Sequence, residues 1–364
     1  MLDVSLVVFG HSASVAGMSL VLCLGLVMAA QWFPRLAGRS ADLMAVQAAH
    51  SRAAPRVAGL AVFGALVFSI LFVPEPYANR YALFLTATSV LFLVGLLEDL
   101  GFGIQPKLRL LAAILSSLMV ILLLEVWLVR SGVAWFDPYM AYWPVGVALT
   151  VFVTVGVANG FNLIDGVNGL AAVAAMACAV ALALIAAQAG YTAMVRFALM
   201  LAFAVFGFVL VNFPLGKIFL GDAGAYTLGF VLSWFGVSIL WHFPVVSPWA
   251  ILLTVFWPVA DTSLAIYRRV RHRSIAFLPD RLHVHQLVMR ALEIYALGRG
   301  RRQLANPLTT VILAPFVISP PLTGAWLWND NSAAGIVVLL YAVGFFGCYV
   351  LTFPVLRRMP RRRQ

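Results

Sequence analysis

The stretch "NGLAAVAAMACAVALALIAAQA", residues 168–189, contains no charged side chain. A bilayer core of roughly 30 Å is crossed by about 20 apolar residues in a helix, so this stretch is long enough to span a membrane. Similar runs recur along almost the whole chain, which is 63% hydrophobic and 10% charged, with a mean hydropathy of +1.00. This composition is typical of membrane proteins and excludes an ordinary soluble domain.

The apolar runs predict about eleven transmembrane helices. Because backbone in lipid must satisfy its own hydrogen bonds, we expect an all-α polytopic integral membrane protein, with a single transmembrane domain over residues 1–364. The first run is preceded by Asp3 and not by basic residues, which favours an uncleaved span over a signal peptide. The predicted spans lie near residues 4–32, 56–74, 80–97, 108–129, 141–158, 168–189, 191–212, 223–243, 246–267, 307–327 and 333–355.

The net charge of +11 is distributed unevenly between the loops. With the N-terminus outside, the inner loops receive the basic clusters from Arg268 to Arg302 and from Arg357 to Arg363, whereas the outer loops keep Arg80, Arg130 and Arg196. Cytoplasmic loops of membrane proteins are enriched in Lys and Arg. The pattern predicts a multi-pass cytoplasmic membrane protein with its C-terminus inside. It also indicates that the lipid bilayer, and no nucleic acid, is the partner of these charges.

Acidic residues are scarce, and six of the thirteen fall near predicted cytoplasmic helix ends. A carboxylate at membrane depth is costly, so it tends to face a polar cavity and a partner. We therefore predict one shared site at the cytoplasmic face. The alternative is that these residues only end helices or form turns. The six are Glu98, Asp99, Asp165, Asp222, Asp261 and Asp280.

Two short glycine-rich segments carry polar side chains of the predicted site. In "NGFNLIDGVNGLAA" (159–172), four polar residues recur every three positions, which predicts a hydrogen-bonding stripe that glycines let a ligand approach. In "GDAGA" (221–225), small residues at a helix start leave N–H groups for phosphate, and Asp222 suits a hard metal ion. Either segment could instead be an ordinary turn.

The basic segment 268–306 is predicted to be a cytoplasmic loop that contributes to the substrate site. Its "HVHQ" places His283 and His285 two residues apart, which is poor spacing for chelation from one helix face. A concentration of arginines around them fits a metal-bound polyphosphate. The competing interpretation is a pair of solvated loop histidines.

Five segments, in order, resemble the polyprenyl-phosphate N-acetylhexosamine-1-phosphate transferase family (glycosyltransferase family 4, undecaprenyl-phosphate GlcNAc-1-phosphate transferase-like). The chain departs from the family pattern at Ala58, Glu98, Asn168, Ala225 and Gln286. The resembling segments are "HSRAAPRVAGLAVF" (50–63), "GLLEDLGFGIQPKLRLL" (95–111), "NGFNLIDGVNGLAA" (159–172), "NFPLGKIFLGDAGAYTLGF" (212–230) and "FLPDRLHVHQLVMR" (277–290).

The resemblance implies a bacterial inner-membrane enzyme that transfers a sugar-1-phosphate from a UDP-N-acetyl sugar to undecaprenyl phosphate. UMP would be released, and synthesis of an O-antigen-like cell-surface polysaccharide would begin. Mg²⁺ is the implied cofactor, with Mn²⁺ as an alternative, and a homodimer is compatible with the resemblance.

The resemblance also implies roles for individual residues. Asp222 and Asn162 are the implied metal ligands. The implied catalytic residues are Glu98, Asp99, Asp165, Asp222, His283 and His285. The implied substrate-binding residues are Arg56, Arg109, Asn159, Asn162, Asn168, Asn212, Lys217, Asp280 and Arg281.

Two other classes of protein fit parts of this pattern. A transporter or flippase would share the many helices, but it should place its ionisable groups near the bilayer midplane and not at one face. An inactive member of the same family would keep the fold and could carry the substitutions Glu98, Asn168 and Gln286. A membrane assay for UMP formation separates these alternatives.

Overall fold

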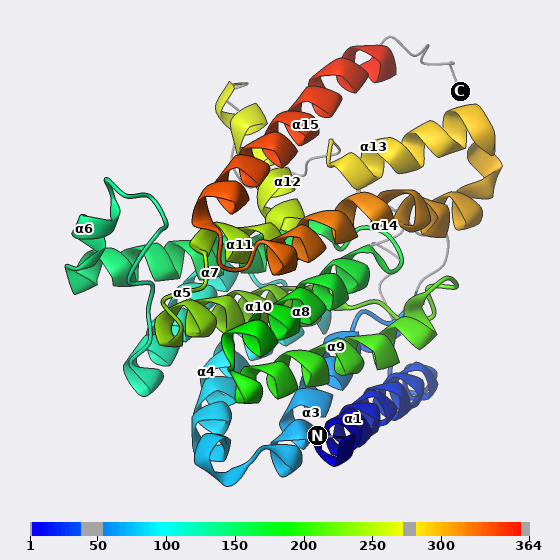
Figure 1. Cartoon of the computed structure of the whole chain (residues 1–364). Helices are drawn as coiled ribbons and strands as arrows, with labels where there is room; N and C mark the ends of the chain where they lie inside the picture. The colour runs from blue at the N-terminus through cyan, green and yellow to red at the C-terminus, as the bar shows by residue number, and fades with distance from the viewer. Residues whose placement is uncertain (1, 38–53, 272–281, 358–364) are drawn as a thin grey trace.

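The computed structural model describes residues 2–37, 54–271 and 282–357, and within these ranges every regular element is a helix (Figure 1). The sequence-based prediction of an all-α fold is therefore confirmed. The longer helices are α1 (Leu2–Ala29), α3 (Ala58–Ser69), α4 (Glu75–Asp99), α5 (Pro106–Leu124), α7 (Trp143–Ile164), α8 (Leu170–Ala189), α9 (Thr192–Asn212), α10 (Gly221–His242), α12 (Phe256–Arg271), α14 (Arg302–Trp326) and α15 (Asn331–Arg357). The shorter elements are η1 (Ile70–Phe72), α6 (Asp137–Met140), α11 (Pro248–Thr254), α13 (Val284–Ala291), η2 (Leu292–Ala296) and η3 (Arg299–Arg301).

Nine helices of the described chain are long and apolar enough to cross a membrane. The bent pair α11–α12 makes a tenth candidate, and the shorter apolar helix Ala58–Phe72 occupies the remaining predicted run. Large apolar side chains such as Leu122 and Phe152 are about three-quarters exposed, at 77% and 75%. In a bilayer such faces meet lipid, so the chain is a multi-pass membrane protein.

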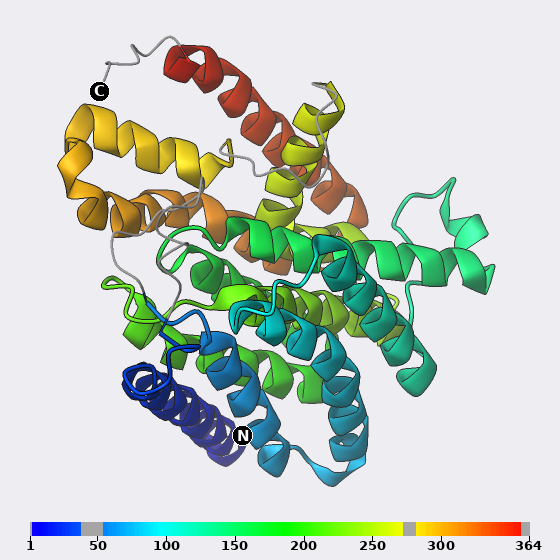
Figure 2. The same cartoon turned by 180° about the vertical axis from the view of Figure 1, so that it is seen from behind.

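Helix α10 lies in the middle of the bundle and contacts α3, α4, α7, α8 and α9 (Figure 1). Its apolar window is 94% buried, more than that of any other candidate span in the described chain. Helix α1 lies along α3 and α9 at one edge of the bundle, as Figure 2 shows from behind. The core therefore forms around α10, and the ends of α10 are fixed by its neighbours.

The predicted span 246–267 is not one straight helix. Helix α11 ends at Thr254 and α12 begins at Phe256, with a bend of 81° between them. Pro258 has no N–H to donate to the carbonyl of Thr254, so a continuous helix would lack that hydrogen bond. The break directly follows Thr254. The bend brings the first half of α12 against α7.

Five chain segments meet at one end of the bundle. Helices α4 and α7 finish there, and α3, α5 and α10 begin there. Helix α7 continues to Ile164, beyond the predicted limit at residue 158, because asparagines end an apolar run but do not end a helix. Every acidic residue of α4, α7 and α10 predicted to share a site lies at this end or just past it.

Candidate active site

Asp222, in the first turn of α10, is the centre of the polar cluster. Its carboxylate forms an ion pair with Arg109 Nη1 from α5, and Arg56 Nη2 lies 3.8 Å from its Oδ1. Asn162 Nδ2 from the last turn of α7 donates to the same Oδ1 at 3.1 Å. The predicted residues Arg56, Arg109 and Asn162 are thus brought together around one carboxylate.

Asp99, the last residue of α4, holds the start of α10. Its Oδ1 accepts from the N–H of Asp222 at 2.8 Å, and its Oδ2 accepts from the N–H of Ala223 at 2.9 Å. The first N–H groups of a helix have no partner within the helix, and a carboxylate there also interacts favourably with the helix dipole. Both oxygens of Asp99 are therefore used in positioning Asp222.

Gly221 makes this contact between α4 and α10 possible. It has a φ of +74°, in the left-handed region that favours glycine, and a Cβ here would lie 2.5 Å from Asp99 Oδ2. The neighbouring Glu98 points elsewhere, because its Oε2 accepts from the N–H of Ile104 at 2.5 Å. Within the acidic pair, Asp99 thus bonds the start of α10, whereas Glu98 bonds the loop that follows α4.

Asp165 lies directly after α7, half-buried, and within electrostatic range of Asp99. Burial raises the pKa of Asp165 to about 7, and the positive charge of Arg56 opposes this rise. Additional positive charge nearby would stabilise the ionised form of this carboxyl group. The structure therefore brings Asp99, Asp165 and Asp222 into one acidic cluster with Arg56 among them.

The two histidines of "HVHQ" are buried at the start of α13. His283 Nδ1 lies 2.6 Å from Asp261 Oδ2 of α12, and the N–H of Val284 donates to Asp261 Oδ1 at 3.2 Å. Burial lowers the pKa of His285 to about 4, so this imidazole is neutral near pH 7. A neutral, buried His285 brings no positive charge to a diphosphate.

His285 packs directly against the turn that carries Asp165. A Cβ added to Gly166 would collide with His285 Nε2. Nε2 is buried and has no hydrogen-bond partner among the described residues. The histidine segment thus closes over the 165–169 turn and adjoins the acidic cluster.

Three predicted substrate-binding asparagines make structural hydrogen bonds. Asn159 Nδ2 donates to the carbonyl of Val155 in its own helix at 2.8 Å. Asn168 Nδ2 donates to Pro214 O at 2.9 Å, and its own N–H donates to Asn306 Oδ1 at 2.8 Å. Asn212 Nδ2 donates to Ile218 O at 2.8 Å. These bonds tie together the turns on which the polar cluster is built.

The remaining predicted residues are one exposed lysine and two residues outside the described chain. Lys217 is exposed on the 213–220 loop. Asp280 and Arg281 lie outside the described residues. Asp261 and Asn306 bond site segments: Asp261 was predicted to share the site but was given no role, and Asn306 was not predicted. The signal for Asp261 was its carboxylate within an otherwise apolar run, whereas nothing in the sequence marked Asn306.

The oxygen donors of the cluster fit Mg²⁺. Mg²⁺ is usually held by one or two carboxylates together with substrate phosphates, and not by a complete protein cage. Asp222 and Asn162 offer a carboxylate and an amide oxygen on adjacent side chains. Within the described residues no group of three or more His, Cys, Asp or Glu could hold a metal ion. This donor set suits an ion that arrives with its phosphate ligand.

We expect Gly166→Ala to lower both activity and thermal stability, because its methyl group would overlap His285 and displace the start of α13. Overpacking of this kind costs about 1–3 kcal/mol. Gly156→Ala in α7, the helix that precedes this turn, is the matched control, since a Cβ there meets nothing within 4 Å. Unfolding midpoints of the two purified variants would check this. Equal midpoints would contradict the docking of His285 on Gly166.

Comparison with known proteins shows which proteins this chain is similar to. Residues 81–240 match the sequence profile described as "Glycosyl transferase family 4". Undecaprenyl-phosphate alpha-N-acetylglucosaminyl 1-phosphate transferases of Yersinia pestis and Salmonella typhi are similar to this chain. They are 28% and 29% identical over 248 residues, which is 66% of this chain and 67% of each relative. A probable undecaprenyl-phosphate N-acetylglucosaminyl 1-phosphate transferase of Bacillus subtilis is 28% identical over 247 residues, with the same coverage.

The matched region contains α4, α5, α7 and most of α10, which carry Asp99, Arg109, Asn162 and Asp222. The fold and the site together define a multi-pass membrane protein with a cluster of carboxylates and arginines at one end of its helix bundle. Over residues 81–240 the chain is similar to glycosyltransferase family 4.

Proposed function

We propose that the protein transfers an N-acetylhexosamine-1-phosphate from a UDP-sugar to undecaprenyl phosphate. An oxygen of the lipid phosphate attacks the β-phosphorus, the bond from that phosphorus to the bridging oxygen breaks, and UMP leaves. The product is an undecaprenyl-diphosphate-linked sugar. The observation that carries this proposal is the convergence of three carboxylates and two arginines at one end of a membrane bundle, in a chain similar to undecaprenyl-phosphate sugar transferases.

Charge explains how the cluster serves this reaction. Both substrates are anionic, and phosphoryl transfer depends mainly on positioning and electrostatic stabilisation. Without substrate, Arg109 and Arg56 interact with Asp222. When a diphosphate enters, these guanidinium groups pair with its oxygens in the bidentate manner that arginine favours. Asp222 is then free to interact with a cation that accompanies the diphosphate.

Asp222 and Asn162 would hold Mg²⁺, which neutralises phosphate charge when it is bound. Asp99 acts as a positioning residue, because both of its oxygens fix the start of α10. Asp165 adds negative charge beside the same site. Asp261 and His283 hold the start of α13 against the turn at Gly166, and so close the side of the pocket formed by that turn.

The cellular setting follows from the charge pattern and the bacterial relatives. We propose that the cluster lies on the cytoplasmic face of the inner membrane, where nucleotide sugars are made, with the N-terminus outside. The chain would then start synthesis of an O-antigen-like surface polysaccharide. Asp99, Asp165 and Asp222 lie at helix ends and not at mid-helix, which favours a transferase over a transporter.

The function is tested by UMP formation in purified membranes supplied with undecaprenyl phosphate and a panel of UDP-N-acetyl sugars. We expect UMP to appear only when both substrates are present, with one sugar preferred. A lipid-linked sugar diphosphate should accumulate in equal amount. Absence of UMP from every pair, with intact protein in the membrane, would contradict the proposed reaction and favour an inactive relative.

Removal of divalent ions should abolish turnover. We expect EDTA to bring UMP formation to background and excess Mg²⁺ to restore it, because the protein alone offers too few oxygen donors to keep the ion tightly. Mg²⁺-saturated EDTA is the control for chelator effects on the membrane. Turnover that continues after thorough chelation would argue against Mg²⁺ at Asp222.

A further inference from the structure

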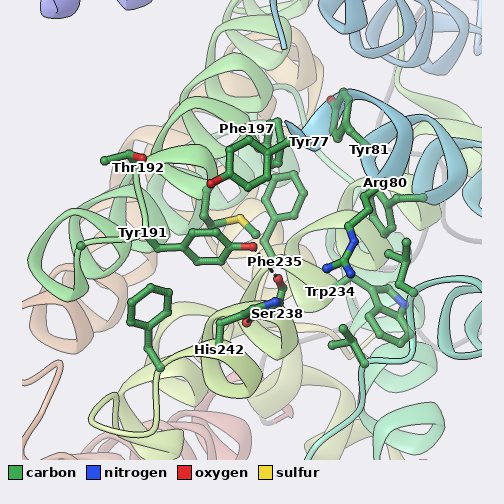
Figure 3. A pocket seen from close by; sticks show the side chains of 16 residues that line it. Tyr77, Arg80, Tyr81, Tyr191, Thr192, Phe197, Trp234, Phe235, Ser238 and His242 are labelled. Carbon is green, nitrogen blue, oxygen red and sulfur yellow. Dashed lines mark hydrogen bonds between the residues drawn. The ribbon is translucent and has the colours of Figure 1, made fainter. Parts of the chain in front are cut away.

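A pocket of about 450 Å³ lies at the end of the bundle opposite the acidic cluster (Figure 3). Helices α4 and α10 connect the two ends: α4 starts near the pocket and finishes at Asp99, and α10 starts at Asp222 and finishes at His242. The turn between α8 and α9 and the end of α5 complete the wall. The pocket is therefore separate from the proposed substrate site and lies at the opposite ends of these two helices.

The pocket contains one buried hydrogen-bond donor that has no partner among the described residues, and one exposed cation. Trp234 is 3% exposed, and its buried Nε1 has no hydrogen-bond partner among the described residues. Buried Trp N–H groups usually find an acceptor, and an unmet donor is costly. Figure 3 shows the Arg80 guanidinium reaching toward Trp234 and Ser238. The described chain records no ion pair for Arg80, and no carboxylate lines the pocket.

The other polar groups of the pocket lie around these two donors. Tyr191 OH lies 3.3 Å from Ser238 Oγ, and Arg80 is close enough to interact electrostatically with Tyr191. Tyr77 and His242 lie at the exposed rim. A ligand that satisfies this set must bring acceptor oxygens and a negative charge.

The rest of the wall is apolar and aromatic. Tyr81 stacks on Phe197 with ring centroids 4.5 Å apart, and Phe235 lies beside Phe197 at 6.4 Å. Such walls accept hydrocarbon, and the position at the helix ends corresponds to the depth of lipid head groups. The combination of one cation, one unmet buried donor and apolar walls suits a phosphate group that is attached to a hydrocarbon chain.

We propose that this pocket binds the phosphate head group of an anionic phospholipid from the leaflet opposite the acidic cluster. The lipid phosphate pairs with Arg80 and accepts from Trp234 Nε1, and the start of its acyl chains lies against the aromatic wall. A lipid bound there joins α4, α5, α9 and α10 at their shared end. It therefore stabilises the two helices whose opposite ends carry Asp99 and Asp222.

The test is a titration of the detergent-purified full-length protein with short-chain phosphatidylglycerol, followed by its unfolding midpoint. We expect a saturable rise of the midpoint, and a much smaller one with phosphatidylcholine of the same chain length. Arg80→Gln should weaken the apparent affinity for phosphatidylglycerol about tenfold or more, because it removes a charge-assisted hydrogen-bond donor. Trp234→Phe should weaken it less, since the ring remains.

Arg196→Gln is the matched control, because it removes the same charge from α9 and Arg196 does not line the pocket. We expect it to bind phosphatidylglycerol like the unaltered protein. Soluble glycerol phosphate separates a lipid from a free phosphate ester, and equal affinity for it would overturn the lipid assignment. Equal stabilisation by phosphatidylcholine, or unchanged affinity in both Arg80→Gln and Trp234→Phe, would overturn the site.

Discussion

Asp222→Ala is expected to reduce UMP formation by about 10³-fold while leaving the protein inserted in the membrane. The substitution removes the carboxylate that interacts with Arg109, Arg56 and Asn162, and with it the proposed metal donor. The backbone N–H of residue 222 and that of Ala223 remain bonded to Asp99, so the start of α10 should stay in place. The measurement is UMP release per unit of membrane-inserted protein.

Asp330→Ala is the control for this experiment. Asp330 lies just before α15, at the end of the molecule away from the cluster, and its Oδ1 accepts from the N–H of Ala333 in the first turn of that helix. Loss of such a helix-start bond costs about 1 kcal/mol, which should leave turnover nearly unchanged. Near-normal UMP release by Asp222→Ala would exclude Asp222 from metal binding and from the reaction.

Asp261→Ala is expected to lower the free energy of unfolding by about 3 kcal/mol or more, because it leaves His283 buried without its partner. The N–H of Val284 would also lose its acceptor. We expect the start of α13 to leave the turn at Gly166, which would raise KM for the UDP-sugar more than it lowers kcat. Thermal unfolding and steady-state kinetics of the purified variant would check both effects.

Asp261→Asn provides the comparison, because its amide oxygen can still accept one hydrogen bond at this position. It should recover part of the stability and part of the affinity. If Asp261→Ala lowered stability without changing KM, the contact between Asp261 and His283 would support the fold alone.

Much of the fold could be predicted from the sequence, because a membrane demands long apolar runs and each run marks a helix. The limits of the helices were harder to predict. Asn159 and Asn162 ended an apolar run but not α7, since a helix needs backbone hydrogen bonds and tolerates polar side chains on one face. The break at Val255 could not be read from apolarity, because residues on both sides of it are apolar.

The polar cluster was predictable only as a gathering of acids at one end. Which side chain touches which depends on contacts across the chain, such as that between Asp99 and Asp222, 123 positions apart. The position of the histidines depended on Asp261, which lies on another helix. The residue types that could form a site can be read from the sequence. The different roles of Glu98 and Asp99 cannot, because they depend on the loop or helix that each side chain contacts.

The burial of α10 has a consequence for how two very different molecules could meet. Helix α10 packs against five helices, and because protein interiors are dense, its first turn has little room to shift. The carboxylate at its first turn is therefore already in position before any substrate binds. In the proposed reaction, a water-soluble nucleotide and a membrane-bound lipid would each move to that position. The two substrates, and not the protein, would make the movement that brings them together.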